Sequence, residues 1–121
     1  MPERITPNLL ERLVDFAVHV IQLSEQLPAT KAGNHVGGQI LRSGTSPAPN
    51  YAESQSAEST DDFIHKLKVA LKELRETEVW LKIIQRAHLV PPSETLHTLA
   101  LECNELISIL VASINTARRN K

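Results

Sequence analysis

The sequence predicts an all-α protein, an antiparallel up-and-down four-helix bundle whose second helix is kinked near Pro47-Pro49. Two observations predict it. Apolar residues recur every three or four positions over long stretches, and segments with proline separate these stretches. No stretch alternates apolar and polar residues as a half-buried strand does. Because 121 residues suffice for one hydrophobic core, we expect a single four-helix-bundle domain over residues 1–121.

The first helix is predicted over about residues 7–27. Thr6 is the predicted cap, Pro7 occupies the first helical position, and Pro28 ends the helix. Its predicted core stripe is Leu10, Leu13, Val14, Ala17, Val20, Ile21, Ser24 and Leu27. A second apolar set widens the stripe to roughly half of the helix surface: Leu9, Phe16 and Leu23.

The second helix is predicted over about residues 31–54 and contains every glycine of the chain. If it stopped at Ser43, it would cover only about half the length of its neighbours at 1.5 Å per residue. We therefore expect it to continue to about Ser54, bent where Pro47 and Pro49 remove backbone donors. The alternative is a helix, a short loop and one more helical turn.

The third and fourth helices are predicted over about residues 60–87 and 93–119. Ser59 and Ser93 are the predicted caps. The third helix directs five residues to the core: Ile64, Leu67, Leu71, Leu74 and Leu81. The fourth helix has the most regular stripe: Leu96, Leu99, Ala100, Cys103, Leu106, Ile107, Leu110, Ile114 and Ala117.

Composition restricts the possible partners. The formal net charge is −1 at pH 7, so nucleic-acid binding would require a local basic patch. The single cysteine is typical of a reducing compartment. No apolar run approaches the roughly 18 residues of a membrane span, and no signal-peptide core follows Met1. We expect a cytoplasmic protein without a membrane partner.

A polar strip flanks the predicted core side of the second helix. Its members are Gln39, Arg42, Ser46, Asn50 and Glu53. We favour a structural network, in which Arg42 pairs with Glu73 of the third helix, and Ser46 and Asn50 satisfy carbonyls that the prolines release. The alternative is a ligand or partner site.

A basic stripe runs along the third helix in steps of three, four or seven residues. It comprises Lys68, Lys72, Arg75, Lys82 and Arg86, the candidate nucleic-acid-binding residues. Two spacings favour a solvated face instead, because Lys72 can pair with Glu76, and Lys82 with Glu78. No aromatic residue is interleaved for base stacking.

Large apolar residues beyond the needs of one core predict self-association. On the third helix, Trp80 and two aliphatic residues lie opposite the predicted core stripe, and the broad apolar face of the first helix adds to them. The candidate oligomer interface is Phe16, Leu23, Val69, Trp80 and Ile83.

No set of residues predicts catalysis, a metal site, a cofactor or a small-molecule substrate. Asp62 with His65, and Glu94 with His97, have the spacing that di-metal bundles use in pairs. Both pairs begin antiparallel helices, so they lie at opposite ends of the bundle and cannot share ions. Cys103 is predicted to be a buried small hydrophobe.

Two segments resemble a known family. They are Gln39–Ser46 followed by Asn50–Glu53, and Asp62–Glu73 continuing to Arg75–Glu78 and Trp80-Leu81. Together they resemble the bacterial four helix bundle protein family, also called the 23S rRNA intervening-sequence or S23-type family. The resemblance implies a left-handed up-and-down bundle, a homopentamer and a suspected role with RNA or other nucleic acid. It extends to a related branch, the accessory proteins of diversity-generating retroelements, which form pentamers that partner a reverse transcriptase.

Two function classes follow from these observations. One is a homopentameric nucleic-acid or ribonucleoprotein accessory protein. The other is a protein-binding scaffold without intrinsic nucleic-acid affinity.

Overall fold

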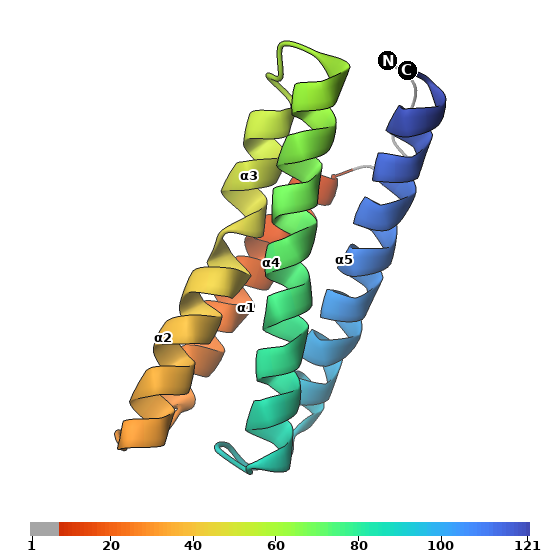
Figure 1. Cartoon of the computed structure of the whole chain (residues 1–121). Coiled ribbons are helices and arrows are strands. Elements are labelled where there is room, and N and C mark those ends of the chain that lie inside the picture. Colours follow the sequence, from red (N-terminus) through yellow and green to blue (C-terminus); the bar gives the residue numbers. More distant parts are fainter. Residues whose placement is uncertain (1–7) are drawn as a thin grey trace.

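The computed structural model describes residues 8–121, and the described chain is entirely helical with short connections. The helices are α1 (Leu9–Gln26), α2 (Lys31–Thr45), α3 (Pro47–Ser54), α4 (Thr60–Arg86) and α5 (Glu94–Arg119). Helices α2 and α3 run end to end as one bent arm, which gives the predicted four-helix bundle (Figure 1). The predicted cap Thr6 and the helix start at Pro7 lie outside the described residues.

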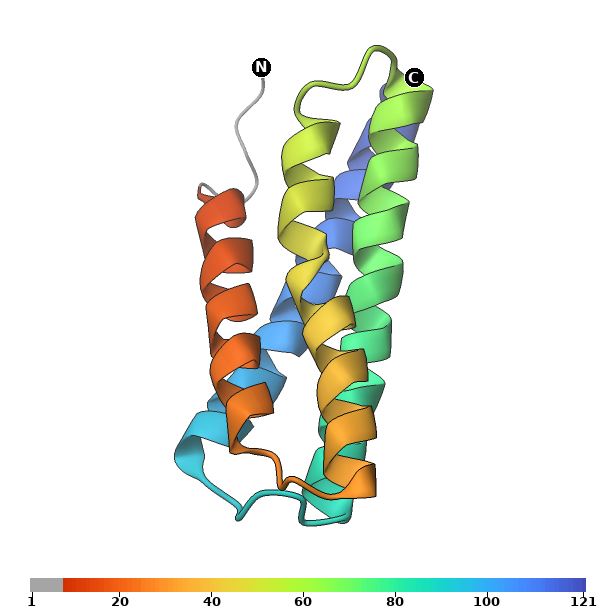
Figure 2. The same ribbon diagram turned by 90° about the vertical axis from the view of Figure 1, so that its left-hand side faces the viewer.

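The four arms are arranged so that α1 and α4 lie on opposite sides. Figure 2 shows α1 at the left and α4 at the right, with α2 and α3 in front and α5 behind. The backbone of α1 approaches α2, α3 and α5 closely but not α4, while α4 packs against α2, α3 and α5. Neighbouring arms are antiparallel, so the predicted up-and-down topology is confirmed.

The second arm bends at one residue and keeps its helical course. Ser46 separates α2 from α3, and its backbone stays right-handed helical at φ −81° and ψ −26°. Pro47 and Pro49 lack the N–H groups that would bond to the carbonyls of Ser43 and Thr45. The predicted kinked helix is confirmed, and the loop alternative is wrong.

Side-chain caps begin three of the helices. Thr30 Oγ1 accepts the Gly33 N–H, Ser59 Oγ accepts the Asp62 N–H, and Ser93 Oγ accepts the Leu96 N–H, each at 3.0 Å. Each cap satisfies a donor that has no partner within its own helix. The two predicted serine caps are thereby confirmed.

Two glycines of α2 permit close contacts, Gly33 with the connection between α1 and α2 and Gly44 with α1 itself. A Cβ atom on Gly33 would lie 1.9 Å from the Pro28 carbonyl oxygen. A Cβ atom on Gly44 would lie 2.7 and 2.8 Å from the two methyl carbons of Val20. The position of α1 against α2 therefore depends on the missing side chains.

The core side of α1 differs from the predicted stripe. Leu9, Leu13, Phe16, Val20 and Leu23 are buried. Two residues of the predicted stripe, Val14 and Ile21, are instead 40% and 43% exposed. The helix is rotated about its axis relative to the prediction because it is apolar over much of its surface, and contacts with its neighbours select the buried side.

By length and composition alone, α5 could cross a membrane, since an 18-residue window has a mean hydropathy of 1.3. The prediction of no membrane span considered only uninterrupted apolar runs, and a window with a few polar residues can reach this mean hydropathy without such a run. The same property is typical of a core helix, and α5 contributes seven buried residues to the bundle core: Leu96, Leu99, Cys103, Leu106, Ile107, Leu110 and Ile114.

Candidate functional site

The basic stripe lies on the solvent-facing side of α4. All five cations, Lys68, Lys72, Arg75, Lys82 and Arg86, are exposed. Within residues 8–121 none of them forms an ion pair. The neutralising pairs that would have favoured a purely solvated face do not form in this part of the chain. Five unpaired cations on one helix remain available for an anionic partner.

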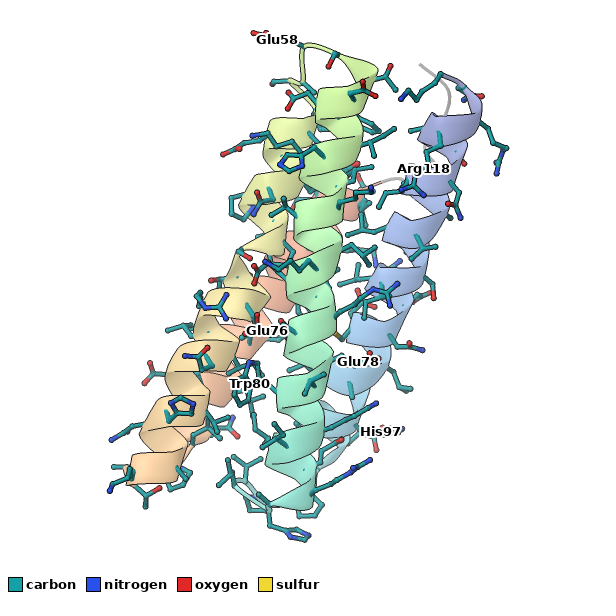
Figure 3. All side chains as sticks on the ribbon, in the orientation of Figure 1. Glu58, Glu76, Glu78, Trp80, His97 and Arg118 are labelled. Atoms are coloured by element: carbon teal, nitrogen blue, oxygen red, sulfur yellow. The ribbon has the colours of Figure 1, made fainter. Side chains whose placement is uncertain are left out.

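The carboxylate expected beside Lys72 has other partners. Glu76 accepts a hydrogen bond from Trp80 Nε1 at 3.0 Å and pairs closely with Arg42 of α2. Figure 3 shows Glu76 and Trp80 on the side of α4 that faces α2, and Glu78 on the side toward α5. Glu76 therefore connects two helices rather than neutralising the basic stripe.

The polar strip contains the predicted ion pair. Arg42 Nη1 lies 2.9 Å from Glu73 Oε1, and Arg42 Nη2 contacts Gln39 Oε1 at 3.3 Å in addition to Glu76. The Arg42 side chain is 50% exposed and that of Glu73 is 14% exposed. The cluster thus links α2 to α4 at the edge of the core. Glu53 is not part of it and pairs with Lys66 at 3.0 Å.

Ser46 and Asn50 do not act as predicted at the bend. Ser46 Oγ is buried without a hydrogen-bond partner. Asn50 Nδ2 donates to the Ser46 carbonyl at 2.9 Å, which also accepts the Asn50 backbone N–H. The carbonyls released by the prolines are those of Ser43 and Thr45, so neither side chain satisfies them. The buried hydroxyl pair at this level is Thr77 with Ser43, at 2.8 Å between the oxygens.

Part of the candidate oligomer interface is buried within one chain. Phe16 and Leu23 are 1% and 6% exposed. Trp80 is half-buried and packs against the core, its ring 6.0 Å from that of His35 in an edge-to-face contact. Val69 is also half-buried, and Ile83 is 39% exposed. Phe16 and Leu23 therefore belong to the core of the single chain.

A different apolar surface on α1 is exposed. Val14, Val18 and Ile21, here called the α1 outer stripe, are 40%, 43% and 43% exposed at helical spacing. On α4, Val79 is 54% exposed beside Ile83 and among the cations of the basic stripe. Sequence reasoning missed Val18 and Val79. The acidic residues on the outer side of α1 were the signal that could have identified this stripe.

A polar groove between α1 and α5 was also missed. Arg12 Nε and Nη2 bind the two carboxylate oxygens of Glu102 at 3.0 and 2.7 Å, and Nη2 binds Glu105 at 2.8 Å. Hydrogen bonding to Glu102 contributes most to raising the pKa of Arg12, and burial opposes it. Beside this fork lies a cleft of about 410 Å³ between α1 and α5, bordered by Phe16 and Leu99. The ion pairs of Arg12 thus join α1, the first helix, to α5, the last helix.

The described residues offer no metal centre. Within residues 8–121, no three or more His, Cys, Asp or Glu side chains are grouped to hold an ion. His65 lies near the N-terminal end of α4 and His97 near the N-terminal end of α5, at opposite ends of the bundle. Cys103 is buried, its Sγ lies 3.4 Å from the Leu74 carbonyl oxygen, and burial raises its pKa to about 12. A thiol in this state is not a nucleophile at neutral pH.

Comparisons with known proteins agree with the resemblance seen in the two sequence segments. The family model of the 23S rRNA-intervening sequence protein matches residues 8–112. A crystal structure of a protein of unknown function, from the S23 ribosomal protein family of Bacteroides thetaiotaomicron, is similar with a TM-score of 0.80. Its sequence is 34% identical, and the match covers 88% of this chain and 97% of that one. No curated protein matches the chain. Neither description names a reaction.

Proposed function

The chain belongs to the 23S rRNA-intervening sequence protein family, and on that premise we propose that it is a non-enzymatic homo-oligomer that serves nucleic acid or a ribonucleoprotein as an accessory protein. The proposed assembly is a pentamer, as the family resemblance implies, and the proposed location is the cytoplasm. The nucleic acid that we propose as its partner is RNA.

The basic stripe of α4 is the observation that carries the proposal. Its five side chains are exposed and free of ion pairs within the described residues. At about 1.5 Å per residue, the 18 positions from Lys68 to Arg86 span about 27 Å, which is long enough to follow several phosphates. A net charge of −1 makes one copy a weak binder.

Self-assembly would compensate for weak single contacts. Linked sites raise avidity by about 10²–10⁴ when several can bind at once. The α1 outer stripe supports self-assembly, because three exposed aliphatic side chains on one side of a helix do not stabilise a monomer. Ring symmetry would repeat the basic stripe of each copy at equal intervals.

The test is a titration of labelled single-stranded RNA at about 50 and 200 mM salt. Binding through five phosphates should weaken about 100-fold over this range, from a log–log slope near −0.7 per phosphate. The variant Lys68→Glu, Lys72→Glu should bind much more weakly than the wild type. A matched variant with two reversals elsewhere, Arg118→Glu, Arg119→Glu, controls for net charge.

Three outcomes have different meanings. Loss of binding in the α4 variant alone supports the proposal. Equal loss in both variants shows that overall charge, rather than the stripe, governs binding. No binding by the wild type at low salt overturns the nucleic-acid role, and the protein-binding scaffold then becomes the better description.

A further inference from the structure

The α1 outer stripe is bordered by acidic side chains. Glu11 and Glu25 are exposed on the outer side of α1, one before and one after Val14, Val18 and Ile21, and Asp15 is exposed at the edge of this surface toward the α1–α5 cleft. None of these three carboxylates forms an ion pair with another residue in the range 8–121. The outer surface of α1 is therefore apolar in its middle and negative at its borders.

The outer surface of α4 has the opposite charge around a similar apolar centre. Val79 and Ile83 are 54% and 39% exposed, one turn apart. Arg75, Lys82 and Arg86 lie within a turn of them and are exposed. These five residues, here called the α4 docking patch, form the C-terminal half of the outer α4 surface.

The charges decide which surface fits the α1 outer stripe. Two α1 helices facing each other would bring their own carboxylates together, which disfavours a symmetric α1–α1 contact. The α4 docking patch instead combines apolar groups for the valines with cations for the carboxylates. We propose that the α1 outer stripe of one copy docks on the α4 docking patch of the next copy.

The positions of the two helices give the contact its symmetry. Because α1 and α4 lie on opposite sides of the bundle (Figure 2), one copy presents both surfaces outward at once. Such a contact is head-to-tail, and head-to-tail contacts generate rings when the rotation between copies closes. Each copy in a ring makes two contacts, so assembly is cooperative.

The docking patch leaves the other half of the basic stripe uncovered. Lys68 lies 11 residues before Val79, which is about 16 Å along the helix. Lys68 and Lys72 therefore stay exposed in the assembly and remain available for phosphates. This inference rests on the proposed self-assembly and adds the surfaces that build it.

Two variants and their mixture test the contact by multi-angle light scattering at micromolar concentration. Val18→Asp removes the α1 surface, and Val79→Asp removes the α4 surface. Both residues are too exposed to disturb the core, and circular dichroism checks the fold. We expect several times 13.4 kDa for the wild type and 13.4 kDa for each variant alone. An equimolar mixture should give twice 13.4 kDa, because one intact α1 surface still meets one intact α4 surface. Leu101→Asp, a change at a 57% exposed residue of α5, is the matched control and should assemble as the wild type does.

The results separate this inference from the proposed function. A monomeric wild type overturns self-assembly as a whole. An assembled wild type with assembly retained in either variant overturns only the α1–α4 contact. If both variants are monomeric and the mixture gives no heterodimer even well above the concentration at which the wild type assembles, the contact is also overturned, since the two surfaces then do not bind each other.

Discussion

Alanine at Gly44 and at Gly38 should have opposite effects on stability, although both glycines lie in α2. A Cβ atom at Gly38 would meet no atom within 4 Å, whereas one at Gly44 would lie 2.7 and 2.8 Å from the methyl carbons of the fully buried Val20. In a helix interior, alanine is more favourable than glycine by about 0.8–1.0 kcal/mol. We therefore expect Gly38→Ala to stabilise the fold by about 0.5–1 kcal/mol.

The Gly44→Ala change adds a steric term to the same helical gain. Overpacking a well-packed core costs about 1–3 kcal/mol. The net result should be a loss of about 0–2 kcal/mol, and the two variants should differ by about 1–3 kcal/mol. Urea unfolding followed by circular dichroism measures this difference, at one fixed protein concentration because association shifts apparent stability. If Gly44→Ala proves as stable as Gly38→Ala, close packing of α1 on α2 is not what glycine provides at this position.

Two further predictions concern the polar strip and the buried thiol. Arg42→Ala should lower the free energy of unfolding by about 1 kcal/mol, because an exposed ion pair contributes about 0–1 kcal/mol and the half-exposed Arg42 makes two such pairs. Urea unfolding measures this loss. A loss above about 3 kcal/mol would mean that the ion pairs of Arg42 behave as buried ones. Cys103 should resist alkylation near pH 8 in the folded protein and should react once the protein is unfolded in urea. The rise of its pKa from 9.0 to about 12 is by itself enough to lower the thiolate fraction roughly 1,000-fold. Because this pKa is raised in the folded state, the contribution of Cys103 to stability is complete below about pH 9 and is lost progressively toward about pH 12. Urea unfolding of the wild type and of a Cys103→Ala variant across this pH range measures the effect, and the variant should lack this contribution.

Helix boundaries were the most predictable part of this protein. The starts at Thr60 and Glu94 follow from Ser59 and Ser93, whose hydroxyl groups cap backbone donors three residues ahead. The bend near Pro47 was also predictable, because a missing N–H group interrupts a helix in any surroundings. The Arg42–Glu73 ion pair was expected from the antiparallel packing of the second and third helices. All of these depend on local chemistry or on helical spacing.

The details of the candidate surfaces were less predictable. Trp80 was expected to face a second copy, yet it packs on the core beside His35 and donates to Glu76. The partner of Glu76 was expected to be Lys72 and is Arg42. For Glu76, Lys72 lies four positions away on the same helix and Arg42 lies on α2, and only the distance between the helices decides which of the two cations forms the pair.

The sequence by itself determined the number of helices, their ends, the kink and the family, since each follows from periodicity, caps, prolines or motifs along the chain. Only the tertiary structure decided which side of α1 is buried. Apolar residues cover so much of α1 that its hydrophobic pattern allows more than one rotation about the helix axis. In the rotation that the structure adopts, Val20 lies against Gly44, and Val14, Val18 and Ile21 are exposed. Burial is a property of contacts between helices, and those contacts exist only once the bundle has assembled.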